Sequence, residues 1–383
     1  MQEYVPGLDG IPATNSTISD IDGEQGILSY RGYSIEDLAE NCSFEETTYL
    51  LMHGELPTAE QLSHFDRRGS RRVKYNAREI MKYMPITGHP MEMLQTSVAS
   101  LGMFYPESRQ YVGGDVEDEE YLDQMALKII ARMGTLVAMW ESMRKGHYPT
   151  EPREDLNYAA NFLWMMFGWE PEPLYAEIMD ACLVLHAEHT INASTFSAMV
   201  TGSTLAQPSM VAAAAIGTLA GPLHGAANQR VVEMLHAIGS PEKVPEFVES
   251  RLEKKQVIWG MGHREYSVKD PRAKILEKYI PRVLEAKGGN VNPLFLTARA
   301  LEEYCEKRLG PKGVFPNVDF YSGILYSEMG IPVDQFTPIF AVSRSAGWMA
   351  HWRQQIRQNR IFRPTQIYSG SEARKVVPMA YRR

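Results

Sequence analysis

Residues 335–357 read QFTPIFAVSRSAGWMAHWRQQIR, and this stretch does most to decide the fold class. Apolar side chains recur along it at intervals of three, four and seven residues: Ile339, Val342, Ala346, Met349 and Ile356. This spacing places them on one face of a helix. A stripe of that length predicts a long helix packed against a core.

Helical signals also dominate elsewhere. Residues 174–189 carry Leu174, Ile178, Cys182 and Leu185 at helical spacing. Runs in which apolar and polar residues alternate are scarce, which argues against a parallel sheet. The sequence therefore predicts an all-α protein.

Helix starts are marked by short polar motifs. Ser34-Ile-Glu-Asp37 and Ser43-Phe-Glu-Glu46 read as capping boxes. Thr58-Ala-Glu-Gln61 follows a proline and is expected to begin another helix.

The length of 383 residues favours two domains. Breaks at Gly221-Pro222 and Gly288-Gly289 bracket a distinct segment. We therefore expect a smaller helical domain at residues 222–330, inserted into a larger helical domain of residues 1–221 plus 331–383.

Charge and cysteine content limit the cellular setting. The net charge of −8 gives no general attraction to nucleic acid or to an anionic membrane. The three cysteines are far apart and lack the spacing of a disulfide framework or zinc ribbon. The N-terminal residues do not resemble a secretory signal, and the most apolar stretch, residues 210–223, is too short to span a bilayer. We expect a cytoplasmic protein without nucleic-acid or membrane partners.

Two histidines lie in glycine-rich turns. His224, in Gly221-Pro-Leu-His-Gly225, is expected near a helix N-terminus, where the dipole favours a neutral ring. A neutral imidazole can donate a hydrogen bond to a developing oxyanion. His263, in Gly260-Met-Gly-His263, has glycines that allow backbone N–H groups to approach an anion. Taken singly, each histidine is also compatible with packing or capping of its turn.

Asp319 is flanked by apolar and aromatic residues, and partial burial would make it a better base. Its alternative role is that of N-cap for a helix beginning near Phe320. His186 and His189 share a helical face, but they match neither common zinc-helix motif, so we expect no metal site.

Single arginines in apolar or Pro/Gly surroundings are suited to bind carboxylates, because the guanidinium plane matches two oxygens. They are Arg272, Arg344 and Arg363. Taken singly, each is more often a partner in a structural ion pair.

Together these motifs resemble the citrate synthase family over essentially the whole chain, most closely its short bacterial and archaeal type. The motifs that carry the resemblance are, in order, His186-Ala-Glu-His-Thr-Ile-Asn-Ala-Ser-Thr195, Gly221-Pro-Leu-His-Gly225, Gly262-His-Arg264 with Asp270-Pro-Arg272, Pro316-Asn-Val-Asp319 and Arg363-Pro364. The resemblance implies an acyltransferase that condenses acetyl-CoA with oxaloacetate and water, giving citrate and CoA. It implies no metal and no cofactor, the CoA thioester being a substrate.

The resemblance also implies residue roles. Asp319 would remove a methyl proton from acetyl-CoA while His224 bonds the thioester oxygen, and His263 would polarise the oxaloacetate carbonyl. The residues expected to hold the oxaloacetate carboxylates are His189, Arg272, Arg344 and Arg363. Arg363 would reach the site of a neighbouring subunit, which makes a homodimer the smallest active unit.

For CoA, the resemblance implies an adenine loop at Val257, Ile258, Trp259 and Gly260. Arg264 and Lys312 would lie near the phosphates. The chain departs from the usual family pattern at Ala226, which a negative φ would allow, and at Glu265, which would weaken CoA binding if it paired with Arg264.

Other functions remain open on sequence grounds. A 2-methylcitrate synthase would use propionyl-CoA with the same residues, and one methylene contributes only about 1–3 kcal/mol to specificity. A non-catalytic helical assembly protein and a metal-dependent hydrolase built on His186 and His189 fit the sequence less well.

Overall fold

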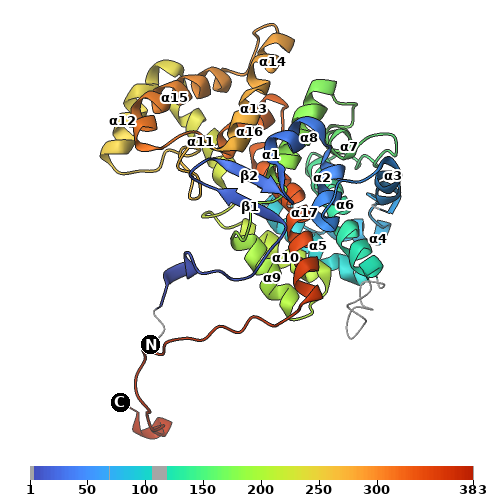
Figure 1. The fold of residues 1–383 in the computed structure, drawn as a ribbon, viewed down its shortest axis with the longest axis vertical. Helices are drawn as coiled ribbons and strands as arrows, with labels where there is room; N and C mark the ends of the chain where they lie inside the picture. The colour runs from blue at the N-terminus through green and yellow to red at the C-terminus, as the bar shows by residue number, and fades with distance from the viewer. Residues whose placement is uncertain (1–3, 69, 106–118, 383) are drawn as a thin grey trace.

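The computed structural model describes residues 4–68, 70–105 and 119–382, and helices make up most of it (Figure 1). The all-α prediction is therefore confirmed. The helices are α1 (Ile35–Asn41), α2 (Phe44–His53), α3 (Ala59–Arg68), α4 (Tyr75–Met81), α5 (Pro90–Phe104), α6 (Glu119–Arg144), α7 (Tyr158–Phe167), α8 (Pro173–His186), α9 (Ala193–Ser203), α10 (Pro208–Leu219), α11 (Ala227–Ile238), α12 (Val244–Glu253), α13 (Pro271–Glu277), α14 (Tyr279–Ala286), α15 (Pro293–Leu309), α16 (Val318–Glu328) and α17 (Phe336–Arg357).

Of the two predicted capping boxes, the one at Ser34 forms only its first half, in which the Ser34 hydroxyl accepts from the Asp37 N–H, and the one at Ser43 is complete. At α2 the Ser43 hydroxyl accepts from the Glu46 backbone N–H, and the Glu46 carboxylate accepts from the Ser43 N–H, forming a full capping box. Thr58 and Gln61 make the same reciprocal pair at α3. These bonds satisfy backbone donors that a helix leaves unpaired at its first turn.

A small antiparallel sheet was not predicted from the sequence. Its strands are β1 (Ser19–Asp22), β2 (Ile27–Tyr30) and β3 (Tyr33–Ser34), in the order β1-β2-β3. Each strand has at most four residues, too few to show a clear alternation. The sheet matters for the site, because the buried Tyr30 hydroxyl donates to the backbone oxygen of Glu188 at 2.8 Å.

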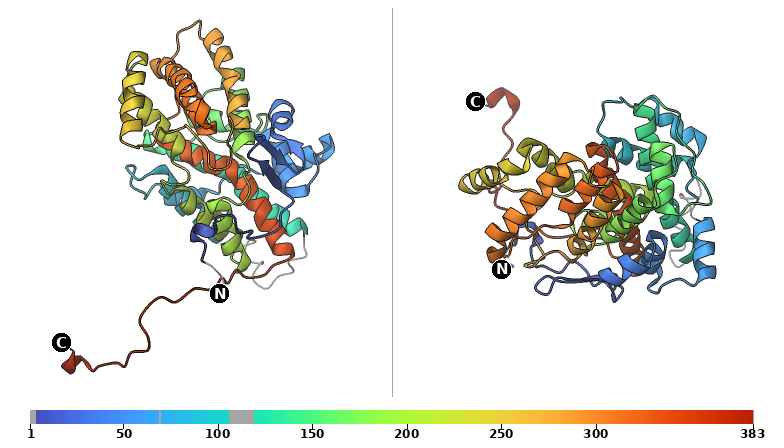
Figure 2. Two further views of the ribbon diagram at one scale, coloured as in Figure 1. Left: turned by 60° about the vertical axis from the view of Figure 1, so that its left-hand side comes forward. Right: turned by 90° about the horizontal axis from the view of Figure 1, so that it is seen from above.

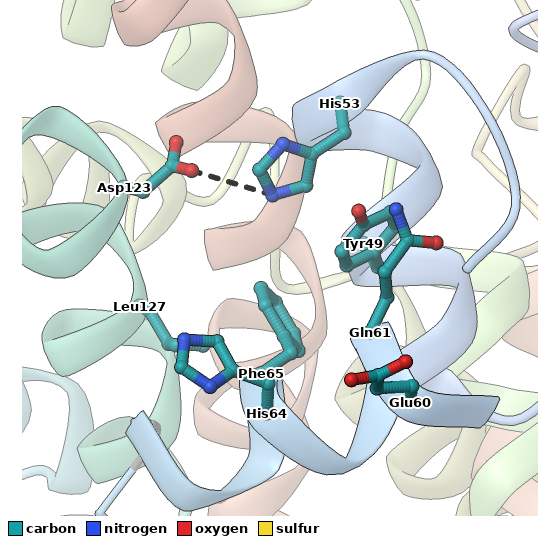
Figure 3. Close-up of a pocket in the computed structure, with 8 residues that line it drawn as sticks. All are labelled: Tyr49, His53, Glu60, Gln61, His64, Phe65, Asp123 and Leu127. Atoms are coloured by element: carbon teal, nitrogen blue, oxygen red, sulfur yellow. Dashed lines mark ion pairs between the residues drawn. The ribbon is translucent and has the colours of Figure 1, made fainter. Parts of the chain in front are cut away.

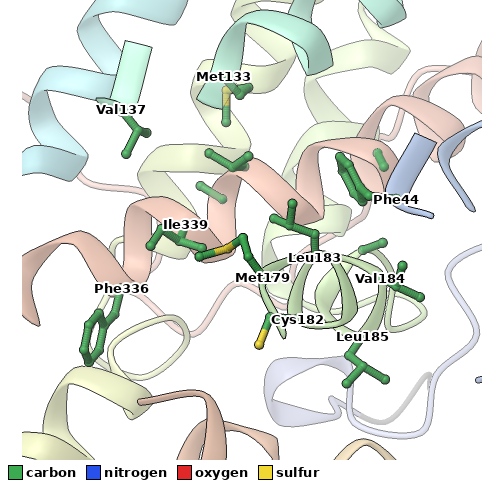
Figure 4. Packing of buried hydrophobic residues seen from close by; sticks show 14 of the residues in the cluster. Phe44, Met133, Val137, Met179, Cys182, Leu183, Val184, Leu185, Phe336 and Ile339 are labelled. Atoms are coloured by element: carbon green, nitrogen blue, oxygen red, sulfur yellow. The ribbon is translucent and has the colours of Figure 1, made fainter. Parts of the chain in front are cut away.

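Helix α17 is the central element of the core. It crosses the molecule and packs against α6, α8 and α9 (Figures 1 and 2). The predicted stripe from Ile339 to Ile356 is buried, and so are Trp348 and Trp352 of the same helix. Figure 4 shows Met179 and Leu183 of α8 with Ile339 of α17 among the side chains that fill this core. Burial on several faces explains why so much of α17 is apolar.

Helices α11–α16, all within residues 222–330, lie together in the upper left of Figure 1. Beyond α17 the chain packs Phe362 against Phe196 of α9, with ring centroids 5.6 Å apart, and then leaves the body as an exposed segment (Figures 1 and 2). Among the described residues, no helix is long and apolar enough to cross a membrane.

Candidate active site

His224 lies in the turn between α10 and α11. Gly225 is required there, because a Cβ at this position would lie 2.3 Å from the backbone oxygen of Leu219. The His224 Nε2 lies 3.2 Å from the backbone N–H of Ser194 and 2.8 Å from its hydroxyl. Since Nε2 accepts from that N–H, the proton of the neutral ring belongs on Nδ1. The ring therefore carries an N–H donor at Nδ1 that it can offer a ligand.

The protonation state of His224 suits that role. Burial, together with the positive charge of Arg344, lowers the pKa of His224 to about 4. The adjacent Ala226 has φ of −89°, a value that any residue with a side chain adopts. Its methyl group therefore brings no backbone strain to the turn.

His263 lies in a loop whose two glycines, Gly260 and Gly262, both have φ above +80°. At Gly260 a Cβ would also lie 2.7 Å from Val231, so a side chain is excluded on two grounds. Burial and the charge of Arg272 lower the pKa of His263 to about 4. The loop thus presents a second neutral imidazole.

Arg272, at the start of α13, is fixed by its neighbour Asp270. Both carboxylate oxygens of Asp270 accept from the guanidinium, at 3.0 and 2.8 Å, and the same carboxylate caps α13 through the Arg272 N–H. Arg272 and Asp270 are 3% and 1% exposed. The Arg272 Nη2 lies 3.3 Å from the Nε2 of His263. The structure therefore brings these two predicted residues together.

Asp319 lies in the first turn of α16. The prediction that Asp319 could serve as the N-cap is wrong: Asn317 is the cap, and its Oδ1 accepts from the N–H groups of Asp319 and Phe320 at 3.1 and 3.3 Å. The Asp319 carboxylate is thus not used for capping. Burial raises the pKa of Asp319 to about 6, while the charges of Arg272 and Arg344 oppose the rise.

His189 and Arg344 complete the buried group. His189 follows α8, and its ring lies 5.3 Å from that of His263, while its Nε2 is 3.1 Å from the Tyr266 hydroxyl. Burial and the charges of Arg272 and His263 hold the pKa of His189 well below its usual value. Arg344, on α17, donates through Nε to the backbone oxygen of His186 at 2.7 Å. Burial lowers the pKa of Arg344 to about 10.

The histidine pair considered for metal binding has protein partners instead. The His186 Nδ1 lies 2.7 Å from the backbone oxygen of Cys182, and His189 faces Tyr266. Within residues 4–68, 70–105 and 119–382, no group of three His, Cys, Asp or Glu side chains is placed to hold a metal ion.

Arg363 lies apart from this group. It follows Phe362 in the exposed segment after α17, and its guanidinium donates to the neighbouring Pro364 oxygen at 3.3 Å. The structure therefore does not bring Arg363 to the site of its own chain.

Of the six residues predicted for CoA, three are exposed: Val257, Arg264 and Lys312. Val257 is 57% exposed, whereas Ile258 is buried. Trp259 is half-buried, Gly260 is buried and Lys312 is exposed. Arg264 pairs with Asp9 at 2.7 Å, rather than with Glu265, so the expected loss of its charge to Glu265 does not occur.

Sequence reasoning missed several supporting residues. Ser194, Asp270 and Asn317 lie inside the quoted motifs, and each orients a predicted site residue through a hydrogen bond. Tyr266 lies outside those motifs. The sequence signal for such residues was a polar side chain close to a candidate site residue. Which group that side chain bonds depends on the fold of the loop and could not be read from the sequence.

A separate pocket of about 340 Å³ lies between α2, α3 and α6 (Figure 3). Its described lining residues are Tyr49, His53, Glu60, Gln61, His64, Phe65, Asp123 and Leu127. None of these belongs to the predicted site set, and His53 and Asp123 form an ion pair at 3.5 Å within it. The chemistry described above is located elsewhere.

Comparisons with known proteins identify the family of this chain. The family model for the citrate synthase C-terminal domain matches residues 7–365. A citrate synthase from Acidithiobacillus ferridurans is 56% identical over 99% of this chain and 98% of its own length, and one from Synechocystis is 49% identical over 99% and 94%.

Solved structures show the same likeness. Citrate synthase from Pyrobaculum aerophilum matches with a TM-score of 0.93 and 39% identity, covering 100% of this chain and 97% of that one. Citrate synthase from Thermoplasma acidophilum, solved as a ternary complex with carboxymethyl coenzyme A and oxaloacetate, matches with a TM-score of 0.90 and 30% identity over 100% of both chains. The predicted family and fold are confirmed, and the chain belongs to the citrate synthase family of acyltransferases.

Proposed function

We propose that His224, His263 and Asp319 carry out the citrate synthase reaction of this chain, in which acetyl-CoA, oxaloacetate and water give citrate and CoA. The observation that carries the proposal is the electrostatic grouping. Two imidazoles with depressed pKa values and one carboxyl with a raised pKa lie within the influence of the buried Arg272 and Arg344. Groups whose pKa values are shifted in opposite directions are typical of acid–base sites.

In the first step Asp319 takes a proton from the acetyl methyl group. Its raised pKa of about 6 makes it a stronger base than an ordinary aspartate, yet leaves it ionised at neutral pH. His224 donates from Nδ1 to the thioester oxygen, where negative charge develops as the enol or enolate forms. Ser194 supports this direction of donation, because its backbone N–H occupies the opposite nitrogen.

In the second step the enolate carbon attacks the oxaloacetate carbonyl, which His263 polarises. In a neutral imidazole one nitrogen accepts a hydrogen bond and the other donates one. The His263 Nδ1 accepts from the Glu265 N–H, so its Nε2 carries the proton and meets another donor, Arg272. An oxaloacetate oxygen between His263 and Arg272 would accept from both. The attack forms the carbon–carbon bond of citryl-CoA as the carbonyl oxygen gains a proton. Water then hydrolyses the thioester of citryl-CoA, which releases citrate and CoA.

The oxaloacetate carboxylates are held by His189, Arg272 and Arg344. The two arginines are buried and already oriented, through Asp270 and the His186 backbone oxygen. Fixed guanidinium groups bind carboxylates with little loss of side-chain freedom on binding. Arg363 of a second copy supplies the remaining contact.

This last assignment requires a homodimer. The segment that carries Arg363 extends from the body and exposes Ile367, Tyr368, Val376 and Met379, each by more than 60%. Apolar side chains displayed together in this way mark a surface that another protein covers. A second copy of the chain would cover them and receive Arg363.

The CoA portion is bound mainly by residues 222–330, which form the smaller inserted domain. Val257, Ile258, Trp259 and Gly260 receive the adenine, with Arg264 and Lys312 near the phosphates.

The cysteines Cys42, Cys182 and Cys305 are all unpaired thiols, which supports a reducing compartment, and we place the enzyme in the cytoplasm.

Mixed dimers test the proposal. Asp319→Asn and Arg363→Ala subunits, each with a different affinity tag, are co-expressed, and the heterodimer is purified. If Arg363 acts in the neighbouring site, one heterodimer site carries both changes and the other carries neither, so about half of the normal activity returns. An inactive heterodimer formed from two inactive homodimers would overturn the shared-site assignment.

A further inference from the structure

Glu188, between the predicted residues His186 and His189, has no part in the mechanism above. Its side chain is 0% exposed and contacts α17 and β1. Its Oε1 accepts from the His351 Nε2 at 3.0 Å and from the Ser19 hydroxyl at 3.0 Å. His351 is itself only 1% exposed, so the pair is enclosed by protein.

Burial of a carboxylate is costly unless other groups compensate its charge. Burial would raise the pKa of Glu188, but His351, Arg344 and Ser19 together hold it below its usual value. The group is therefore ionised, and an ionised carboxylate only accepts hydrogen bonds. The His351 Nε2 must then carry a proton, so His351 is the donor and Glu188 the acceptor in this hydrogen bond.

The same pair lies at the turn that carries His189. Thr190 has φ of +53°, a left-handed value that is strained for a residue branched at Cβ. The Thr190 N–H donates to the Ser19 hydroxyl at 3.2 Å, and this hydroxyl also contacts Glu188. On the other side, the Tyr30 hydroxyl accepts from the Glu188 N–H at 3.2 Å.

Helix α17 also contacts this turn, through Gly347. The Gly347 N–H donates to the Ala187 oxygen at 3.1 Å. A Cβ at Gly347 would lie 2.1 Å from the Glu188 Oε2 and 2.5 Å from the Ala187 backbone oxygen. Only glycine therefore permits this close approach of α17 to the turn. Contacts from β1, β2 and α17 thus determine the backbone of residues 187–190.

We propose that the buried Glu188–His351 pair and Ser19 form a positioning device for His189, holding the strained turn so that this imidazole faces oxaloacetate. The inference rests on the proposed role of His189. Glu188 is anchored by Ser19 and His351, while the adjacent His189 faces Tyr266 and His263. The device acts through His189, and its loss would weaken oxaloacetate binding selectively.

Binding of oxaloacetate to the full-length protein, measured by titration calorimetry, tests this, with the two KM values measured beside it. Ser19→Ala removes the hydroxyl shared by Glu188 and Thr190 and should weaken oxaloacetate binding about 3–10-fold. His351→Ala removes the buried partner of the Glu188 carboxylate and leaves it with the Ser19 hydroxyl, so it should weaken oxaloacetate binding about 10–100-fold. His351→Gln, which still offers an N–H to Glu188, should recover most of that loss. In each variant the acetyl-CoA KM should stay within about twofold.

Ser343→Ala is the matched control. It removes a buried hydroxyl between α8 and α17, bonded to the Leu183 oxygen, without touching residues 187–190. Its oxaloacetate affinity should be unchanged. If His351→Ala does not fold, Ser19→Ala decides alone.

Unchanged oxaloacetate affinity in Ser19→Ala, or an equal rise in both KM values, would overturn the positioning role. His189→Ala separates this result from a failure of the proposed function. If oxaloacetate binding is insensitive to His189→Ala, the assigned role of His189 is wrong. If it is sensitive to His189→Ala but not to Ser19→Ala, only the positioning device is wrong.

Discussion

The two halves of the proposed site differ in how their charges are held. In the oxaloacetate half, His189, Arg272 and Arg344 are at most 8% exposed, and each has a protein hydrogen-bond partner. In the CoA half, Arg264 and Lys312 are exposed, and Arg264 pairs with another surface residue. Charges in water are screened, whereas buried charges act strongly on a ligand.

The difference follows the size of the two ligands. Oxaloacetate is small, so its affinity must come from a few strong contacts that are arranged before it binds. CoA is large and can gain affinity from many weaker contacts. We therefore expect single substitutions in the oxaloacetate half to have large effects and those in the CoA half small ones.

The largest effect is expected for the proposed base, which serves both halves. Asp319→Asn keeps the shape of the side chain but cannot take the methyl proton, so kcat should fall about 10³-fold or more. Oxaloacetate binding, measured by calorimetry, should remain. Near-normal turnover would remove Asp319 as the base.

Next comes a change in the oxaloacetate half. Arg344→Lys retains the charge but loses the planar fork and the Nε bond to the His186 oxygen. We expect the oxaloacetate KM to rise about 100-fold, since disrupting a buried charged contact has effects of this size. The acetyl-CoA KM serves as the internal control, and a comparable rise in it would indicate general damage.

Acid should inactivate the enzyme by about tenfold for each pH unit below the pKa of the base. Asp319 must be ionised, and its pKa is raised to about 6, so activity is lost as pH falls through that value. His224 and His263, with pKa values of about 4, remain neutral throughout this range. The pH profile of kcat/KM for acetyl-CoA, measured under conditions where the fold is intact, checks this; an acid limb near pH 4 would contradict it.

The smallest effects belong to the CoA half. Arg264→Gln should raise the acetyl-CoA KM only about 2–5-fold, because the charge is exposed and screened. Asp9→Asn removes the partner of Arg264 and should lower that KM slightly. Steady-state kinetics at low and high salt provide the measurement. A large change in oxaloacetate KM in either variant would contradict the proposed division of the site into two halves.

Local patterns were predictable where local physics decides the outcome. The stripe of α17 and the caps at Ser43 and Thr58 depend on spacing along one helix, and both are present. The family motifs also indicated which chemical groups to expect.

Other features depend on contacts between distant segments. The choice of Asn317 over Asp319 as cap is decided by the backbone path entering α16. Asp270 holds Arg272 two residues away, but its carboxylate also accepts from the Val318 N–H of α16, which is distant in sequence. The strained Thr190 is held by Ser19, far away in sequence. No pattern within a short window carries this information.

CoA thiol release by the purified protein, given oxaloacetate and either acetyl-CoA or propionyl-CoA in parallel, tests the citrate synthase activity itself. We expect release that requires oxaloacetate and is faster with acetyl-CoA. Preference for propionyl-CoA would make the activity that of a 2-methylcitrate synthase, and no release from folded protein with either thioester would show that the chain does not catalyse the reaction.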